Sequence, residues 1–491
     1  MSHGRRNLGE GTPRSKFYQG PFGRICGDLK PWHPPGTDPH RNPGHLELLL
    51  ENIANNEMVE GPTPRESEIP AGYTYFGQFV DHDITFDPTS SLMRANDPEK
   101  LHNFRTPRLD LDNVYGRGPE DSPYLYDHAD TGLTGNVEKL LIGQIQGSNF
   151  PDLPRNQEGR ALIGDMRNDE NSIVSSLQLA FLLAHNTLVD RARAQGIEDS
   201  FTAARNSLRW LYQWVLWNDF VRRIVNDNAH GHALKKTTSP DGRTVWNLGL
   251  KDVYNWKHQP FIPVEFSVAA YRFGHTMVRN SYQTNQPHQG FGNPVILFDP
   301  GGNDLRGFRP MALNRTVQWD WFLHMTTSGG PFPQMAMGID TKLSLSLTQL
   351  PGMASPGNVL AFRNLLRGVR MGLPSGKDVA RKFCLPIANV DDDHDALWFY
   401  ILKEAESLPG QHKSKMLGRL GSIIVAATFA GLLKGDPCSW VNVAPCWTPD
   451  DDPLLIKADD DQDSAVGDNQ DWSLASIIRL SGLPVDAGGF P

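Results

Sequence analysis

A histidine stands between two carboxylates in the triplet Asp81-His82-Asp83, within an otherwise apolar and aromatic stretch. Carboxylates and imidazoles stay in water unless they are paired, coordinated or used in chemistry, because burying them without a partner is costly. We therefore interpret the triplet, with Gln78 and Phe86 beside it, as part of a functional site. A helix cap or a solvated turn is the alternative, and the triplet alone leaves that choice open.

A second oxygen-rich group follows in the loop that begins at Thr106. Its hydroxyl and the carboxylates of Asp110 and Asp112 are spaced so that a turn can aim several oxygens at one point. Calcium takes roughly six to eight oxygen ligands, which hydroxyls, carboxylates and backbone carbonyls supply. Acidic turns are mostly solvated, so the loop indicates a calcium site only if a carboxylate from elsewhere joins it.

Two charged residues, Arg167 and Glu170, lie three positions apart at the entrance to a predicted amphipathic helix at 171–193. Residues at this spacing share one helix face, so the two side chains point the same way. A pair that acts on a ligand and a plain intrahelical ion pair both satisfy this spacing.

His275 falls on the apolar face of another predicted helix, at 264–278. It is therefore expected to face the interior, where a lone histidine is more often a satisfied core residue than a metal ligand. Asn364 and Arg367 lie three apart on a predicted helix at 359–374, again on one face.

The elements that would position these residues are predicted to be helical almost throughout, because apolar residues recur at three-to-four spacing. Residues 87–160 are instead dominated by Pro, Gly, Asp and Asn, and predict long ordered loops. Trp210, Trp214 and Trp217 are interpreted as core and not as a cofactor cage. Further helices are predicted at 46–55, 201–225, 417–433 and 472–483, with a helical Trp/Phe/Met-rich stretch after residue 312. The predicted fold class is mainly α, with little β structure.

Composition limits the possible partners and the domain plan. The 491 residues are 39% hydrophobic and carry a net charge of -9, which disfavours nucleic-acid binding and supports a soluble, folded chain. Without an apolar run of about 18 residues, no membrane span is expected. We predict an extended arm at 1–45, one large domain at 46–445, and an acidic linker with a C-terminal helix at 446–491.

The start of the chain lacks the apolar core of a secretion signal. The expected location is therefore the cytoplasm, or export by a route without a cleavable signal. Four cysteines are too few for a disulfide scaffold, and whether Cys438 pairs with Cys446 stays open.

Five separated motifs, in order over residues 70–435, resemble the animal-type haem peroxidases of the peroxidase-cyclooxygenase superfamily. The motifs are Gly77-Gln-Phe-Val-Asp-His-Asp83, the loop 106–112, Gly164-Asp-Met-Arg-Asn-Asp-Glu170, Arg272-Phe-Gly-His275 and Asn364-Leu-Leu-Arg-Gly368. The resemblance implies a single large helical haem peroxidase domain that binds haem b and Ca²⁺. The missing secretion signal and cysteine framework suggest a leaner, microbial relative.

The resemblance also implies roles for individual residues around the haem. His82 and Arg167 would be the catalytic pair with Gln78 beside them, and His275 would bind the iron while Asn364 accepts its second N–H. The remaining haem contacts would be Asp81 and Glu170 as ester-forming carboxylates, Arg272 and Arg367 at the propionates, and Phe86. The calcium ligands would be Asp83, Thr106, the Arg108 carbonyl, Asp110 and Asp112.

The implied activity is reduction of hydrogen peroxide through a ferryl intermediate, with oxidation of small anionic or aromatic donors. Asn171 stands where the strongest chloride oxidisers carry methionine, so bromide, iodide, thiocyanate and phenols are expected rather than chloride. Arg272 stands where cyclooxygenases carry tyrosine, which disfavours a haem-dependent fatty-acid dioxygenase. That dioxygenase remains the alternative, followed by a non-catalytic haem-bearing adhesion protein.

Overall fold

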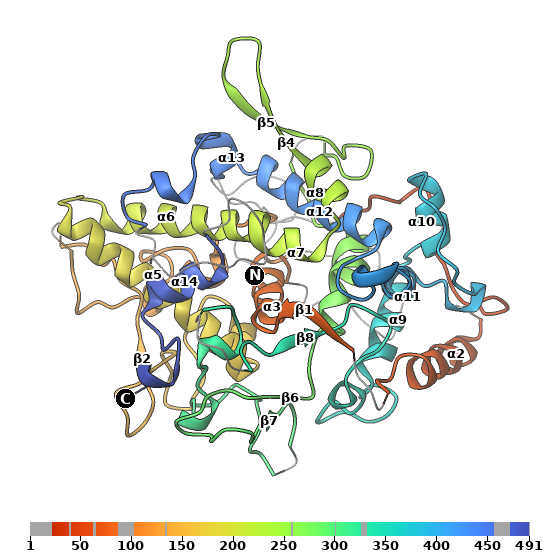
Figure 1. The fold of residues 1–491 in the computed structure, drawn as a ribbon, viewed down its shortest axis with the longest axis horizontal. Coiled ribbons are helices and arrows are strands. Elements are labelled where there is room, and N and C mark those ends of the chain that lie inside the picture. The colour runs from red at the N-terminus through yellow and green to blue at the C-terminus, as the bar shows by residue number, and fades with distance from the viewer. Residues whose placement is uncertain are drawn as a thin grey trace, which may run out of the picture.

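A computed structural model gives the fold of the protein (Figure 1). It describes residues 22–38, 41–61, 65–86, 103–132, 135–256, 259–299, 301–325, 331–455 and 472–490. The first half of the predicted arm, 1–21, and most of the predicted acidic linker, 456–471, therefore lie outside the described residues.

The described chain is mainly helical, which confirms the predicted fold class. The longer helices are α2 (Pro43–Asn56), α3 (Gly72–Ile84), α5 (Ser172–Ala194), α6 (Ser200–Val215), α9 (Leu360–Arg370), α11 (Leu397–Glu406), α12 (Arg419–Gly435) and α14 (Leu474–Ser481). The shorter ones are α4 (Asp112–Tyr115), α7 (Arg222–Ile224), α8 (Asp227–Ala233), α10 (Gly376–Lys382) and α13 (Trp440–Val443). The helices predicted from apolar periodicity at 46–55, 171–193, 201–225, 359–374, 417–433 and 472–483 are all present within a few residues.

Strands contribute little, as predicted. The described strands pair as four antiparallel two-stranded sheets. The pairs are β1 (Glu66–Pro70) with β8 (Met335–Met337), β2 (Gly143–Gln144) with β3 (Pro151–Asp152), β4 (Leu234–Thr238) with β5 (Thr244–Leu248), and β6 (Ser281–Tyr282) with β7 (Val295–Ile296). The β4–β5 hairpin projects from the helical body (Figure 1).

Helix α3 lies near the centre of the molecule (Figure 1) and is buried along most of its length. Its aromatic side chains hold it there: Phe79 stacks on Phe181 of α5 with ring centroids 4.4 Å apart, and Phe76 meets Phe220 edge-on at 5.5 Å. The first residue of the helix, Gly72, has to be a glycine, because a Cβ atom there would lie only 2.7 Å from the Phe322 carbonyl oxygen. Successive residues on a helix point about 100° apart, so the charged triplet at its end reaches three different environments.

The segment predicted as one regular helix at 264–278 is a π-helical turn, Glu265–Ala269, followed by a 3₁₀ turn, η6 (Ala270–His275). The regular-helix prediction is therefore wrong in geometry. The change occurs at Ala269, whose φ of -128° and ψ of -76° depart from helical values. The Glu265 carboxylate fixes this segment against the N-terminal part of the chain by accepting the Cys26 amide N–H at 2.9 Å.

The helical stretch predicted after residue 312 is also wrong. In the described part of this stretch up to residue 325, the helical elements are two short 3₁₀ turns, Leu313–Arg315 and Trp319–Trp321. Backbone donors that a helix would use internally are taken by other segments: Trp319 donates to the Pro484 carbonyl at 3.2 Å, and Asp320 to the Val485 carbonyl at 2.9 Å. Tertiary pairing thus replaces helix formation here.

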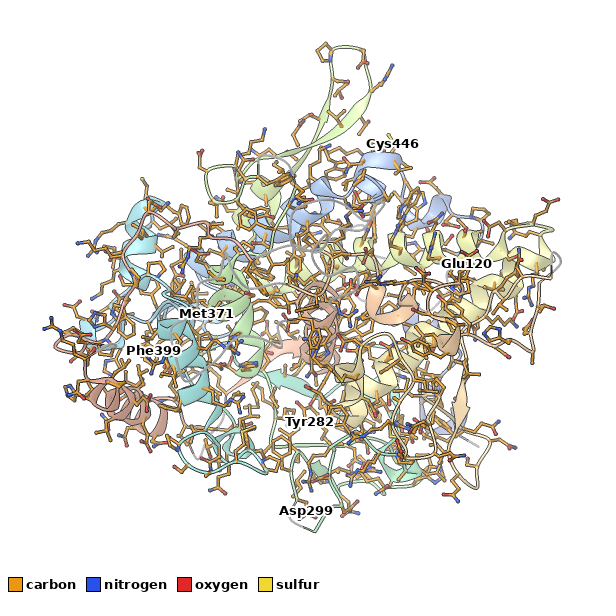
Figure 2. The ribbon with its side chains drawn as sticks, turned by 180° about the vertical axis from the view of Figure 1, so that it is seen from behind. Glu120, Tyr282, Asp299, Met371, Phe399 and Cys446 are labelled. Carbon is orange, nitrogen blue, oxygen red and sulfur yellow. The ribbon has the colours of Figure 1, made fainter. Side chains whose placement is uncertain are left out.

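Of the three tryptophans predicted as core, Trp217 is buried in it, and Trp210 and Trp214 are half-buried and pack against it. Trp214 lies 5.2 Å from Trp440, and Trp210 lies 5.3 Å from Trp447, measured between ring centroids. Cys446 lies near the edge of the molecule (Figure 2) and is exposed, and both it and Cys438 are free thiols.

Among the described residues, helix α5 is long and apolar enough to cross a membrane by length and composition. In the fold, 83% of the most apolar 18-residue part of α5 is buried inside the protein. Helix α14 packs against α5, and its Leu474 amide donates to the Asp219 carboxylate at 2.9 Å. Helix α14 thus packs against the helical body of the protein.

Candidate active site

A cavity of about 700 Å³ opens between α3, η6 and α9. Its walls also include the segment that enters α5, with Glu170 and Asn171, and the apolar residues Phe298, Leu347 and Leu360. The predicted site residues that line it are Gln78, Asp81, His82, Glu170, Arg272, His275, Asn364 and Arg367. The fold thus brings together side chains from widely separated parts of the sequence.

His82, on the last turns of α3, is buried in the cavity wall. Its Nδ1 atom lies 2.7 Å from the Oδ1 atom of Asn168. Burial, and then the positive charge of Arg167, lower the pKa of His82 to about 3. The ring is therefore neutral, which is the state that can accept a proton.

Gln78 connects two neighbours at the cavity wall. Its amide nitrogen donates to the Glu170 carboxylate, and its oxygen accepts from the Asn171 amide at 3.1 Å. Burial raises the pKa of Glu170 to about 7. Burial also raises the pKa of Asp81, whose carboxylate accepts the Thr85 hydroxyl at 3.0 Å. Two carboxyl groups that are unusually easy to protonate therefore face one cavity.

His275 contributes the second imidazole, with Nδ1 2.7 Å from the side-chain amide nitrogen of Asn364. The Asn364 oxygen is occupied, since it accepts from Arg272 at 2.6 Å. The amide is thus turned opposite to the expectation that Asn364 accepts the imidazole N–H. The cause is competition, because a guanidinium is a stronger donor than a neutral imidazole.

Three guanidinium groups, those of Arg272, Arg363 and Arg367, line the cavity together. Burial, and then the charge of Arg367, lower the pKa of Arg272 to about 10. A cluster of cations in a partly desolvated wall favours anionic groups, and guanidinium forks suit carboxylates. Arg363 was not singled out in the sequence, although it directly precedes the asparagine of a recognised motif.

Arg167 and Phe86 are not among the residues that line the cavity. The Arg167 guanidinium donates to the Asp165 carboxylate at 2.7 Å and to the Thr85 carbonyl at 2.6 Å, and lies 4.7 Å from the Phe86 ring centroid. The structure therefore directs this side chain at Asp165, although its charge still acts on His82.

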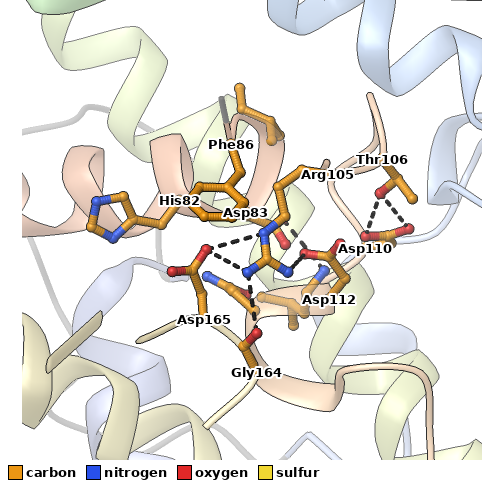
Figure 3. Close-up of polar contacts among 12 residues, drawn as sticks. His82, Asp83, Phe86, Arg105, Thr106, Asp110, Asp112, Gly164 and Asp165 are labelled. Carbon is orange, nitrogen blue, oxygen red and sulfur yellow. Dashed lines mark hydrogen bonds and ion pairs between the residues drawn. The ribbon is translucent and has the colours of Figure 1, made fainter. Parts of the chain in front are cut away.

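Three carboxylates converge beside α3, as Figure 3 shows. Oxygens of Asp83, Asp110 and Asp112 all lie within 4.8 Å of one another, and Oδ1 of Asp83 is buried with no hydrogen-bond partner among the described residues. The Thr106 hydroxyl donates to Asp110 at 2.9 Å.

The charges of this cluster oppose one another. Burial, and then neighbouring carboxylates, raise the pKa of Asp83 well above its ordinary value and that of Asp110 to about 8. Burial raises the pKa of Asp112 to about 6, although Arg105 acts in the opposite direction. An orphaned buried oxygen among crowded carboxylates fits a divalent cation with oxygen ligands. The fifth expected ligand residue, Arg108, has its guanidinium 3.9 Å from Asp436.

Arg105 lies between the carboxylate cluster and Asp165 and contacts both (Figure 3). It donates to Asp112 at 3.0 Å and to Asp165 at 3.0 Å, and Asp165 in turn holds Arg167. Burial opposes ionisation of Asp165, but hydrogen bonding and charge from the two arginines hold its pKa below the ordinary range. Sequence reasoning missed Arg105 and Asn168, because neither residue type signals chemistry without knowledge of its distant partners.

Residues 89–299 match the family model described as animal haem peroxidase. That range is less than half of the 491 residues, and over it the chain is similar to the animal haem peroxidases. The family description names the cofactor, and the cavity offers what haem requires: one imidazole held at Nδ1, guanidinium groups for carboxylates, and a second imidazole on the same cavity.

Curated proteins similar to this chain include the peroxidasin homolog pxn-2 of Caenorhabditis elegans, 25% identical over 420 residues, covering 66% of this chain and 28% of the relative. Human thyroid peroxidase is 26% identical over 329 residues, covering 60% of this chain and 31% of the relative. The chain thus spans less than a third of the length of these two relatives.

Solved structures share the fold at low identity. Peroxidase A from Dictyostelium discoideum has a TM-score of 0.59 at 17% identity, covering 89% of this chain and 92% of that one. The fatty acid alpha-dioxygenase of Arabidopsis thaliana has a TM-score of 0.57 at 13% identity, covering 90% of this chain and 77% of that one.

Proposed function

We propose that this protein is a haem peroxidase that reduces hydrogen peroxide and oxidises small donors. The observation that carries the proposal is the pair of buried imidazoles, His82 and His275, on one cavity that also presents a cluster of guanidinium groups. Bound haem would supply the iron that accepts the peroxide oxygen and stores the oxidising equivalents. The side chains around it bind, orient and move protons.

In this proposal His275 would hold the iron, and Asn364 would orient the ring through Nδ1. For that, the Asn364 amide would have to turn so that its oxygen accepts from His275, which would free the Arg272 guanidinium to bind a carboxylate of the cofactor. His82, neutral and braced at Nδ1, takes the proton from one peroxide oxygen at Nε2 and returns it to the departing oxygen. The positive charge of Arg167, which acts on His82, would stabilise the negative charge that develops on the departing oxygen.

The donors proposed are bromide, iodide, thiocyanate and small phenols. Asn171 supports a preference for these donors over chloride, because an asparagine has no sulfur with which to form the sulfonium bond that the resemblance associates with methionine at this position. Asp81 and Glu170 both line the cavity, which supports the proposal that they form esters with the haem. Calcium in the Asp83 cluster would fix the end of α3 next to His82.

Stopped-flow mixing with peroxide tests the role of His82. We expect His82→Ala to bind haem but to react with peroxide about 100-fold more slowly or worse, as loss of a positioned acid–base group implies. Equal rates for the variant and the wild type would refute the assignment.

A fatty-acid dioxygenase is the second candidate, favoured by the fold shared with the alpha-dioxygenases. The apolar residues in the cavity wall, among them Leu347, Leu350 and Leu360, could accept an acyl chain. Tyr271 also lines the cavity, with its hydroxyl donating to the Gly77 carbonyl at 3.0 Å. Oxygen consumption with palmitate in the absence of peroxide would favour this activity, and no consumption would favour the peroxidase.

A further inference from the structure

We infer that a buried circuit of amides, headed by Asn168, fixes His82 as its Nδ1–H tautomer and thereby keeps the Nε2 lone pair facing the cavity. The inference rests on the proposed function and deepens it, since it assigns Asn168 and Gln178 as positioning residues for the proton-transferring ring. Neither side chain lines the cavity.

The circuit begins and ends on helix α3. His82 Nδ1 lies 2.7 Å from Asn168 Oδ1, and Asn168 Nδ2 donates to Gln178 Oε1 at 2.7 Å. Gln178 Nε2 then donates to the Asn113 carbonyl at 3.3 Å, and Asn113 Nδ2 donates to the Phe79 carbonyl at 3.2 Å. Phe79 precedes His82 by three residues, so the circuit closes on the helix turn that carries the imidazole.

The direction of every donor follows from a backbone carbonyl, which can only accept. Because the Asn113 carbonyl accepts, Gln178 must present its NH₂ there and its oxygen to Asn168. Asn168 must then donate to that oxygen and turn its own oxygen to His82. An oxygen facing Nδ1 requires a proton on that nitrogen, so Nε2 of the neutral ring carries the lone pair.

Burial prevents the circuit from reversing. Asn168, Gln178 and Asn113 are each 0% exposed, so water cannot replace a lost partner. Turning one amide would place two oxygens or two NH₂ groups face to face, and each buried unsatisfied group is destabilising. The circuit also joins three further elements to α3, since Asn168 lies in the 3₁₀ turn η3 (Met166–Asp169), Gln178 in α5 and Asn113 in α4.

Two substitutions at one position separate tautomer control from packing. Asn168→Asp keeps an oxygen acceptor next to His82, whereas Asn168→Leu removes it at similar volume. The full-length chain would carry ¹⁵N-labelled histidine and gallium protoporphyrin as a diamagnetic substitute for haem. His82→Gln identifies the ring signals by their loss.

We expect the wild type and Asn168→Asp to show a protonated Nδ1 and an unprotonated Nε2 for His82. Asn168→Leu should show the Nε2–H form or a mixture of tautomers. The same signals in Asn168→Leu as in the wild type would overturn the inference, and so would an Nε2–H wild type.

Gln178→Met keeps the inference testable if Asn168→Leu does not fold. It removes the acceptor that orients Asn168 while nearly preserving side-chain size, and it should raise the Nε2–H fraction of His82. An unchanged fraction would overturn the inference. In the haem-loaded protein, Asn168→Leu should also react with peroxide about 100-fold more slowly, and Asn168→Asp should largely restore the rate.

Failure of this inference differs from failure of the proposed function. The tautomer is read without turnover, so a protein inactive toward peroxide can still show the predicted ¹⁵N signals. Conversely, if the protein is an active peroxidase but its His82 ¹⁵N signals do not change in the variants at position 168, the proposed function stands and the inference is wrong.

Discussion

Nδ1 of His275 lies 2.7 Å from the Asn364 amide, whose oxygen is held by Arg272 at 2.6 Å. One asparagine thus stands between an imidazole suited to iron and a guanidinium suited to a carboxylate. An iron-binding His275 needs the Asn364 oxygen, so this arrangement predicts that cofactor binding and the release of Arg272 occur together. Because His275 and Arg272 compete for the side-chain oxygen of Asn364, a change at one of these two residues should affect the other.

Replacing Asn364 should move the reduction potential of bound haem. Asn364→Asp offers His275 a stronger acceptor and should lower the potential, whereas Asn364→Leu removes the acceptor and should raise it. Each shift should be about 60 to 120 mV, corresponding to a 10- to 100-fold effect of an outer partner. Spectroelectrochemical titration measures the order, and equal potentials in all three proteins would contradict this role.

Covalent attachment predicts a difference in haem extraction. After treatment with peroxide, acidified acetone should leave haem on the wild-type polypeptide if Asp81 and Glu170 form esters. Asp81→Asn combined with Glu170→Gln should release it completely, since neither amide can form an ester. Complete extraction from the wild type would show that the bonds do not form.

Calcium should stabilise the protein more at pH 8 than at pH 5. The metal-free folded state binds protons more tightly than the unfolded state, because the pKa of Asp110 is raised to about 8 and that of Asp112 to about 6. Its stability therefore falls as pH rises from the ordinary carboxyl range toward pH 8. A bound cation favours the charged carboxylates and reverses this loss.

Thermal unfolding with calcium or a chelator measures this difference. We expect the rise in Tm on adding calcium to be about 3 °C larger at pH 8 than at pH 5. Asp110→Asn should abolish most of the rise, while Asp241→Asn, on the projecting hairpin, serves as the control. An equal rise at both pH values would argue against the carboxylate cluster as the binding site.

Gly307 should not tolerate a side chain. A Cβ atom there would lie 1.8 Å from the Asp169 carbonyl oxygen, in the segment that follows Arg167 and Asn168. Gly307→Ala should therefore destabilise the fold by about 2 kcal/mol, as overpacking of tight sites does. Gly231→Ala, where a Cβ atom meets nothing within 4 Å, is the matched control. Denaturant unfolding should separate the two variants.

Four of the five motifs that carry the family resemblance contribute residues to one cavity, among them His82 and His275. Their relationships could not be predicted. Asn168 is an ordinary amide whose partner lies 86 positions earlier, and only the fold joins them. The orientation of Asn364 depends on a guanidinium 92 positions away.

The local backbone conformation was predicted wrongly where tertiary contacts, and not the helical spacing of apolar residues, determine it. The turn that carries His275 ends a π-helical and 3₁₀ segment, although its apolar spacing is that of a regular helix. The spacing of apolar residues predicts which side chains face the core, but it does not predict whether the backbone between them is an α-, π- or 3₁₀-helix.

Titration of the purified chain with haemin, followed by its visible spectrum with and without peroxide, tests whether this protein is a haem peroxidase. We expect a bound-haem spectrum that changes on adding peroxide, and at least a roughly tenfold loss of haem affinity in His275→Ala. His185→Gln, a buried histidine outside the cavity, should behave as the wild type. If His275→Ala binds haem as tightly as the wild type, or if the spectrum does not change on adding peroxide, the proposed haem peroxidase function is wrong.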